Sequence, residues 1–168
     1  MSGGAGRLRP RRPLQIAVVG GGECSRQSAA IARTVGRELA GAGAVVVCGG
    51  LGGVMEAVAR GAAEGGGTVL GILPGCERTQ GNPYLTLALP TGLGHARNVL
   101  VAAAGDAMIA LPGKHGTLAE IAFAGVFGRP VVALGAWSRV PGVVRARHPA
   151  EAVRRALELA ARARRRHY

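Results

Sequence analysis

Short apolar runs that end at glycine or proline alternate with stretches of helical spacing along most of the chain. Such runs are typical of buried strands in a parallel sheet. They lie at residues 14–19, 44–48, 68–73, 107–111 and 131–134, with a weaker alternation at 84–89. Because strands and helices alternate at short spacing, we predict a doubly wound α/β fold, with a mainly parallel, Rossmann-like sheet and helices on both faces.

The same spacing predicts where helices begin and which sides they bury. Either Ser25 or Ser28 is placed to cap the first helix. In the helix that starts at Thr117, apolar positions three and four apart predict a single buried face. That face would consist of Leu118, Ile121, Ala122 and Gly125.

Three of the predicted strands end in glycine-rich loops, at residues 20–22, 49–53 and 112–116. The carboxyl ends of parallel strands meet at one edge of the sheet, where ligands bind in this fold class. The last loop opens a helix, whose first N–H groups lack partners and form an anion site. We therefore predict a phosphate or ligand site that uses Gly21, Gly22, Gly50, Gly52, Gly53, Gly113, Lys114, His115, Gly116 and Thr117.

Two common phosphate-binding motifs do not fit these loops. Gly20-x-Gly22-x-x-Ser25 has serine at the third glycine position of the dinucleotide motif, and the second strand ends without the acid that binds a ribose. The sequence therefore disfavours NAD(P). In the third loop Gly113-Lys114 is followed by His115, where a Walker loop requires serine or threonine. ATP hydrolysis is disfavoured as well.

Charged residues near the third loop are candidates for ligand contacts. Lys114 is the only lysine of the chain, and the sequence leaves open whether it binds phosphate or is exposed. His115 is expected to face solvent or to support a ligand-binding residue without touching the ligand, rather than to act as a general base. Arg97 starts a helix beside the same sheet edge, and a planar guanidinium suits phosphate. Glu120, just beyond the loop amides, would contact another part of the ligand, such as a sugar.

The net charge of +12 comes mostly from the two ends of the chain. Residues 1–13 are expected to be a disordered basic tail, residues 14–161 one nucleotide-binding domain, and residues 162–168 a basic end. Only 3% of residues are aromatic, so no stacking platform accompanies the arginines and nucleic-acid binding is not expected. The chain lacks an apolar run of the ~20 residues that cross a bilayer, so we expect a cytoplasmic protein without membrane contact.

The three cysteines carry no recognisable metal-binding pattern. Cys24, Cys48 and Cys76 are far apart, and no pair has the spacing of metal ligands. They are expected to be small buried residues, and no metal site is predicted.

The segment Pro112-Gly113-Lys114-His115-Gly116-Thr117-Leu118-Ala119-Glu120 resembles the Pro-Gly-Gly-x-Gly-Thr-x-x-Glu signature of the LOG (Lonely Guy), lysine-decarboxylase-like family. Arg97 stands where that family has its catalytic arginine. Three further segments resemble the branch that contains molybdenum-cofactor carrier proteins and uncharacterised bacterial members: 49–57, 82–84 and 91–98. The chain departs from the family pattern at Lys114 and at Glu56, where the family has glycine.

The resemblance implies a function and an assembly. LOG enzymes are phosphoribohydrolases that split nucleoside 5′-monophosphates into free base and ribose 5-phosphate, with no required cofactor, and Arg97 and Glu120 would be the catalytic pair. The alternative is a non-catalytic carrier or sensor of a phosphorylated cofactor such as molybdenum cofactor. The bound ligand would be a nucleoside monophosphate or a phosphorylated pterin. Family members pair through helices that flank the pocket, so a homodimer or larger homo-oligomer is implied.

Overall fold

The computed structural model describes residues 12–166, and the predicted basic tail therefore lies almost wholly outside the described residues, as do the last two residues of the chain. Within this range seven strands form one sheet in the order β4-β3-β2-β1-β5-β6-β7, and every pairing is parallel. The strands are β1 (Gln15–Val19), β2 (Val45–Cys48), β3 (Val69–Leu73), β4 (Leu87–Pro90), β5 (Ala107–Ala110), β6 (Val131–Leu134) and β7 (Val144–Ala146). The predicted doubly wound α/β fold is confirmed.

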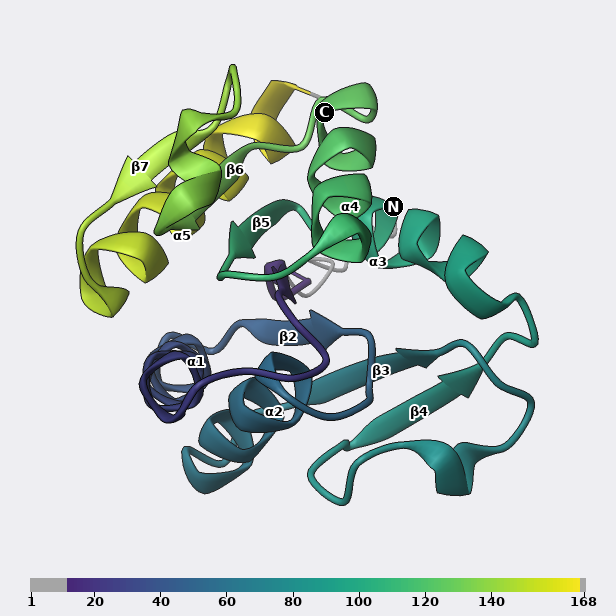
Figure 1. The fold of residues 1–168 in the computed structure, drawn as a ribbon. Helices are drawn as coiled ribbons and strands as arrows, with labels where there is room; N and C mark the ends of the chain where they lie inside the picture. The colour runs from purple at the N-terminus through teal and green to yellow at the C-terminus, as the bar shows by residue number, and fades with distance from the viewer. Residues whose placement is uncertain (1–11, 167–168) are drawn as a thin grey trace, which may run out of the picture.

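Helices cover both faces of the sheet (Figure 1). The α-helices are α1 (Arg26–Gly41), α2 (Val54–Glu64), α3 (Asn98–Ala104), α4 (His115–Val126) and α5 (Pro149–Arg166). Short 3-10 turns are η1 (Arg78–Gln80), η2 (Gly94–Arg97) and η3 (Ala136–Arg139). Successive strand side chains point to opposite faces. In β1, Ile16 and Val18 pack in the core under α1, α2 and α5, whereas Ala17 and Val19 pack in the core under α3 and α4.

Several local predictions match the structure closely. Ser25 is the N-cap of α1, and its hydroxyl accepts a hydrogen bond from the Ser28 N–H at 3.1 Å. The weak alternation at 84–89 becomes the edge strand β4, shifted by a few residues. It ends at Pro90, which a sheet tolerates only at such positions. The helix that carries Arg97 begins as the 3-10 turn η2 and becomes α-helical at Asn98.

The predicted buried face of α4 was wrong for three of its four residues, and only Ile121 is buried as expected. The helix begins at His115, two residues earlier than expected, and buries Thr117, Glu120, Ile121 and Ala124. Leu118 is 40% exposed, and Ala122 and Gly125 also face outward. The apolar residues of α4 lie on nearly all sides of the helix, so their spacing does not define one buried face. The polar residues Thr117 and Glu120 were buried instead, because they point toward the sheet edge.

An arginine near the end of α5 ties that helix to the start of β1. The guanidinium of Arg164 lies 2.6 Å from a carboxylate oxygen of Asp106, and it also donates to the carbonyls of Arg12 and Pro13. The same Asp106 oxygen accepts the Gln15 N–H at 2.8 Å. At least one of the C-terminal arginines therefore contributes to the fold rather than to a solvated surface.

The three cysteines differ in burial. Cys48 is buried, but Cys24 and Cys76 are exposed, so the prediction of three buried cysteines was wrong for two of them. Both exposed cysteines lie in loops, outside the strands and helices that form the core. None of the described helices combines the length and apolar character needed to cross a membrane.

Candidate functional site

The three glycine loops meet backbone to backbone at the carboxyl edge of the sheet. The Gly21 N–H donates to the carbonyl of Pro112 at 3.0 Å, and the Gly21 carbonyl accepts the Val54 N–H at 3.0 Å. A Cβ on Gly53, whose φ is +63°, would lie 2.3 Å from the Gly21 carbonyl oxygen. A Cβ on Gly113 would lie 2.9 Å from the Gly21 nitrogen. Side chains at these positions would therefore force the loops apart.

Not every loop amide is available to a ligand. The Gly21 N–H is taken by Pro112. The second loop is held from outside by Asn82, which donates to the carbonyls of Gly50 and Leu51 at 2.9 and 3.0 Å. The sequence reasoning treated all three loops alike, but the bond to Pro112 makes the first one partly structural.

Free donors gather at the start of α4. The N–H groups of His115, Gly116 and Thr117 donate to no acceptor within residues 12–166. Lys114 is the N-cap residue and makes no side-chain cap, so it leaves these amides uncovered. Lys114, His115 and Gly116 are exposed, whereas Thr117 is buried beneath Gly113. This arrangement is that of an anion site at a helix N-terminus.

The two predicted catalytic residues lie together beside this helix start. The Arg97 Nη1 is 3.7 Å from the Glu120 Oε1. Their exposed fractions are only 7% and 6%. Arg97 comes from the end of η2 and Glu120 from the second turn of α4, so two elements of different sequence regions build the pair. The Arg97 Nη2 also donates to the Gly49 carbonyl at 3.3 Å, which connects the pair to the second loop.

Burial controls the ionisation of this pair. Removal from water raises the pKa of Glu120 to about 7, although the nearby Arg97 charge opposes the shift. Burial also lowers the pKa of Arg97, against the attraction of Glu120. The Cys48 thiol below them has its pKa raised to about 11, again mainly by burial. Glu120 can therefore gain or lose a proton near neutral pH, whereas the thiol stays protonated.

Asn98 is the site residue to which the sequence reasoning gave no role. Its side chain is 6% exposed, and its Oδ1 accepts a hydrogen bond from the Arg97 Nη1. Its Nδ2 lies 3.6 Å from the place that a Cβ on Gly116 would occupy, and this amide donates to no acceptor in the described range. The Arg97 Nε is likewise buried without a partner. The sequence signal for Asn98 as a site residue was its polar side chain directly after Arg97.

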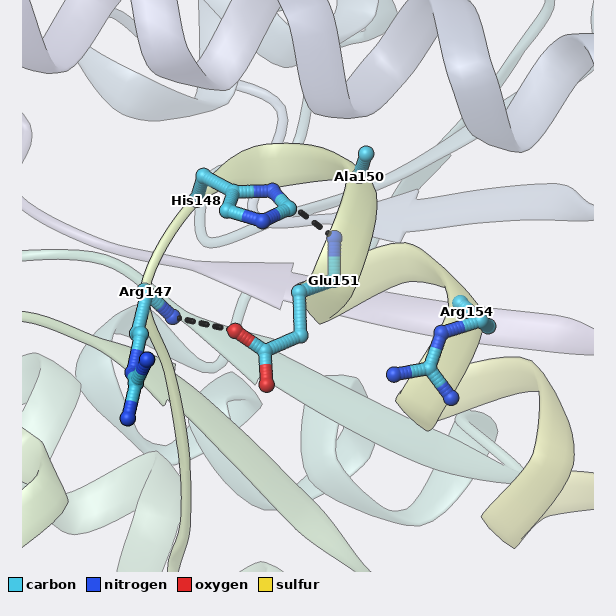
Figure 2. Close-up of a pocket in the computed structure, with 5 residues that line it drawn as sticks. All are labelled: Arg147, His148, Ala150, Glu151 and Arg154. Carbon is cyan, nitrogen blue, oxygen red and sulfur yellow. Dashed lines mark hydrogen bonds between the residues drawn. The ribbon is translucent and has the colours of Figure 1, made fainter.

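Two hollows of the surface lie away from the Arg97–Glu120 pair. One, of about 380 Å³, is at the start of α5 between Arg147 and Arg154 (Figure 2). His148 already caps this helix: its Nδ1 accepts the Glu151 N–H at 3.3 Å, and the Glu151 Oε2 accepts the Arg147 N–H at 2.8 Å. The other, of about 440 Å³, lies between α1 and α2 and touches Gly53 and Glu56. Arg97 and Glu120 line neither hollow.

Known structures share this fold over nearly their whole length. The molybdenum cofactor binding protein of Rippkaea orientalis superposes with a TM-score of 0.85 at 29% identity, covering 89% of this chain and 99% of its own. The molybdenum cofactor carrier protein of Chlamydomonas reinhardtii gives a TM-score of 0.81 at 30% identity, covering 89% and 99%. These neighbours confirm the resemblance drawn from the loop motifs.

Sequence comparisons agree with the structural ones. An uncharacterized protein of Archaeoglobus fulgidus is 44% identical over 121 residues, which is 72% of this chain and 80% of that protein. The family model for the SLOG cluster4 family matches residues 13–161. Together with the carrier-type neighbours, this match supports a ligand-binding, LOG-like protein. The chain belongs to the SLOG cluster4 family.

Proposed function

We propose that this protein binds a small phosphorylated ligand at the glycine-rich sheet edge, with the phosphoryl group at the start of α4. The observation that carries the proposal is the set of three N–H groups at His115, Gly116 and Thr117 that have no acceptor among the described residues, beside the buried Arg97–Glu120 pair. Amides at a helix N-terminus favour phosphate. The ligand classes that we expect are nucleoside monophosphates and phosphorylated pterins.

A carrier or sensor role is the first form of this proposal. Its support is the likeness to two proteins described as binding or carrying molybdenum cofactor, at 29% and 30% identity over 89% of this chain. The low exposure of Arg97 and Glu120 is compatible with a carrier role.

A phosphoribohydrolase activity is the second form, and one observation favours it. Glu120 is a buried carboxyl group whose pKa, raised to about 7 by burial, lies near neutral pH. When the bond between C1′ and the base breaks, its electron pair leaves with the base and positive charge grows on the sugar. Ionised Glu120 would stabilise that charge, a water oxygen would bond to C1′, and the proton that this water loses would go to the departing base. We expect this reaction to need no added cofactor.

One experiment separates the two forms. Purified protein is incubated with AMP, and free adenine is followed by chromatography while binding of AMP and of a phosphorylated pterin is measured by calorimetry. Release of adenine that disappears in Glu120→Gln supports hydrolysis. Binding without release supports a carrier. If neither ligand class gives heat, the proposed phosphoryl site is wrong.

The homo-oligomer is a separate proposal. Leu100 of α3 and Leu118, Val126 and Phe127 at α4 are 38–77% exposed, although all are large apolar residues. Exposed apolar side chains gathered on neighbouring helices often mark an interface. We propose that a second copy of this chain covers this surface, as the resemblance to LOG proteins implies.

A further inference from the structure

The hollow between α1 and α2 has a strongly basic lining that the proposed function does not use. Arg26 and Arg33 of α1 and Arg60 of α2 line it, together with Glu56 and the exposed Cys24. Its volume of about 440 Å³ falls in the usual range of small-molecule sites, about 300–1,000 Å³. Since the lining holds three guanidinium groups and one carboxylate, it favours an anionic occupant.

Two of these guanidinium groups are held in place by one carboxylate. Arg33 binds Glu64 through Nε at 2.8 Å and Nη2 at 2.6 Å, and Arg60 binds it through Nε at 3.2 Å. The Arg60 guanidinium also lies 5.9 Å from the centre of the Tyr84 ring. These contacts fix the two arginines without using all of their donors. A site with fixed donors loses less side-chain entropy when it binds.

Donors remain for a ligand after these contacts are counted. Within residues 12–166, Nη1 of Arg33 and both terminal nitrogens of Arg60 donate to no other group, and neither does the Arg26 side chain. Guanidinium N–H groups of this kind bind phosphoryl oxygens. Three side chains from two helices therefore offer unused charge-assisted donors to one open surface hollow.

We propose that the α1–α2 hollow is a second anion-binding site, which takes the phosphate chain of a nucleoside triphosphate. The site is separate from the start of α4, because Arg97, Asn98 and Glu120 are not part of its lining, and Gly53 is the one residue that it shares with the glycine-rich loops predicted to bind ligand. A chain of several phosphates suits three arginines better than a single phosphoryl group does. Glu56, at the end next to Gly53, opposes a phosphate there and accepts a sugar hydroxyl or base N–H instead.

Cys24 provides a direct test because it lines the hollow and is exposed. The probe is ATP without magnesium, and alkylation of each cysteine by N-ethylmaleimide is followed by peptide mass spectrometry. We expect saturating ATP to slow alkylation of Cys24 at least fivefold. Cys76 is the internal control, since it is exposed but lies outside the hollow, and its rate should stay unchanged.

Variants decide whether the arginines are responsible. Arg26→Ala with Arg60→Ala should weaken ATP protection of Cys24 at least tenfold, and Glu56→Gln should strengthen it. Arg154→Ala is the matched control, because Arg154 is also an exposed helix arginine with a carboxylate four residues on. Circular dichroism checks that each variant is folded.

Two results of the alkylation experiment would overturn the proposal. Absence of Cys24 protection at millimolar ATP would do so, and so would equal protection in the double arginine variant. Protection by oligothymidylate but not by ATP would assign the surface to a polynucleotide instead. The variant Asn98→Asp keeps this test independent of the α4 site: Cys24 protection should survive it even where binding of a monophosphate is lost.

Discussion

The Arg97 Nη1 lies 3.7 Å from the Glu120 Oε1, and each side chain is more than nine-tenths buried. This separation is longer than a charge-assisted hydrogen bond of about 2.7–2.9 Å, so the two charged groups attract each other without forming a hydrogen bond. Glu120 makes no hydrogen bond to another described residue, and the Arg97 Nε has no partner. Both groups thus retain bonding capacity for a ligand.

The first prediction concerns stability and pH. Because the folded-state pKa of Glu120 is raised to about 7 from an ordinary value near 4.5, the folded protein holds one more proton than the unfolded chain between these values. The contribution of Glu120 to stability is therefore fully present below about pH 4.5 and is lost as pH rises through 7. A shift of this size corresponds to roughly 3 kcal/mol at most.

Glu120→Gln should remove this dependence. Urea unfolding at pH 5 and pH 8 measures the free energy of unfolding for both proteins. We expect the difference in free energy of unfolding, wild type minus variant, to fall by about 2–3 kcal/mol from pH 5 to pH 8. Taking the difference cancels the histidines, which titrate in the same window. A difference that does not change with pH would mean that Glu120 is ionised throughout.

The second prediction concerns Asn98 and separates ligand binding from folding. Asn98→Ala removes the acceptor that orients Arg97, and the loss of a buried hydrogen bond to a charged group costs about 1.5–3 kcal/mol of stability. Asn98→Asp keeps an acceptor for Arg97 but replaces the free Nδ2 donor by a negative charge. We expect Asn98→Asp to remain folded yet to bind phosphorylated ligands at least tenfold more weakly than wild type.

Calorimetry with AMP and thermal unfolding are the two measurements for Asn98. A merely structural role would make Asn98→Ala the weaker binder and leave Asn98→Asp close to wild type. The reverse order is the one that a direct contact between Nδ2 and the phosphoryl group requires.

The third prediction concerns the contact between glycine loops. A Cβ on Gly113 would lie 2.1 Å from the Thr117 Oγ1 and 2.9 Å from the Gly21 nitrogen. Because backbone on one side and a buried side chain on the other leave little room to move, Gly113→Ala should destabilise the protein by about 2 kcal/mol or more. Gly125→Ala is the control: Gly125 lies inside α4 with open space around it, and the substitution should stabilise the protein by about 0.5–1 kcal/mol. Chemical denaturation of both variants checks the contrast, and equal stabilities would contradict the close packing of the loops.

The fourth prediction concerns assembly. Val126 is 77% exposed and Leu118 40% exposed on α4. If a second copy covers this surface, Leu118→Glu with Val126→Glu should convert the oligomer to a monomer without unfolding it, as light scattering after gel filtration would show. Glu158→Lys on α5, outside this surface, is the control and should leave the mass unchanged. A wild-type protein that is monomeric at high micromolar concentration would contradict the proposal.

Local patterns in the sequence determined the strands, the glycine loops and their common edge. Short apolar runs closed by glycine or proline have few other structures open to them, and parallel strands joined by right-handed crossovers bring their carboxyl ends together. The motif at 112–120 was enough to place Glu120 beside the third loop. Arg97 was placed near the same edge by its position at the start of a helix.

Only the tertiary structure decided which side chains are buried and which backbone groups are already hydrogen-bonded. It buried Thr117 and Glu120 in α4 rather than Leu118 and Ala122, directed the Gly21 N–H to Pro112, and put Asn98 between Arg97 and the start of α4. It also left Cys24 and Cys76 exposed and gathered arginines of α1 and α2 around one hollow. Periodicity and motifs predict the local structure of each segment. Burial, pKa values and free donors depend on contacts between residues far apart in the chain, and the sequence pattern does not contain these.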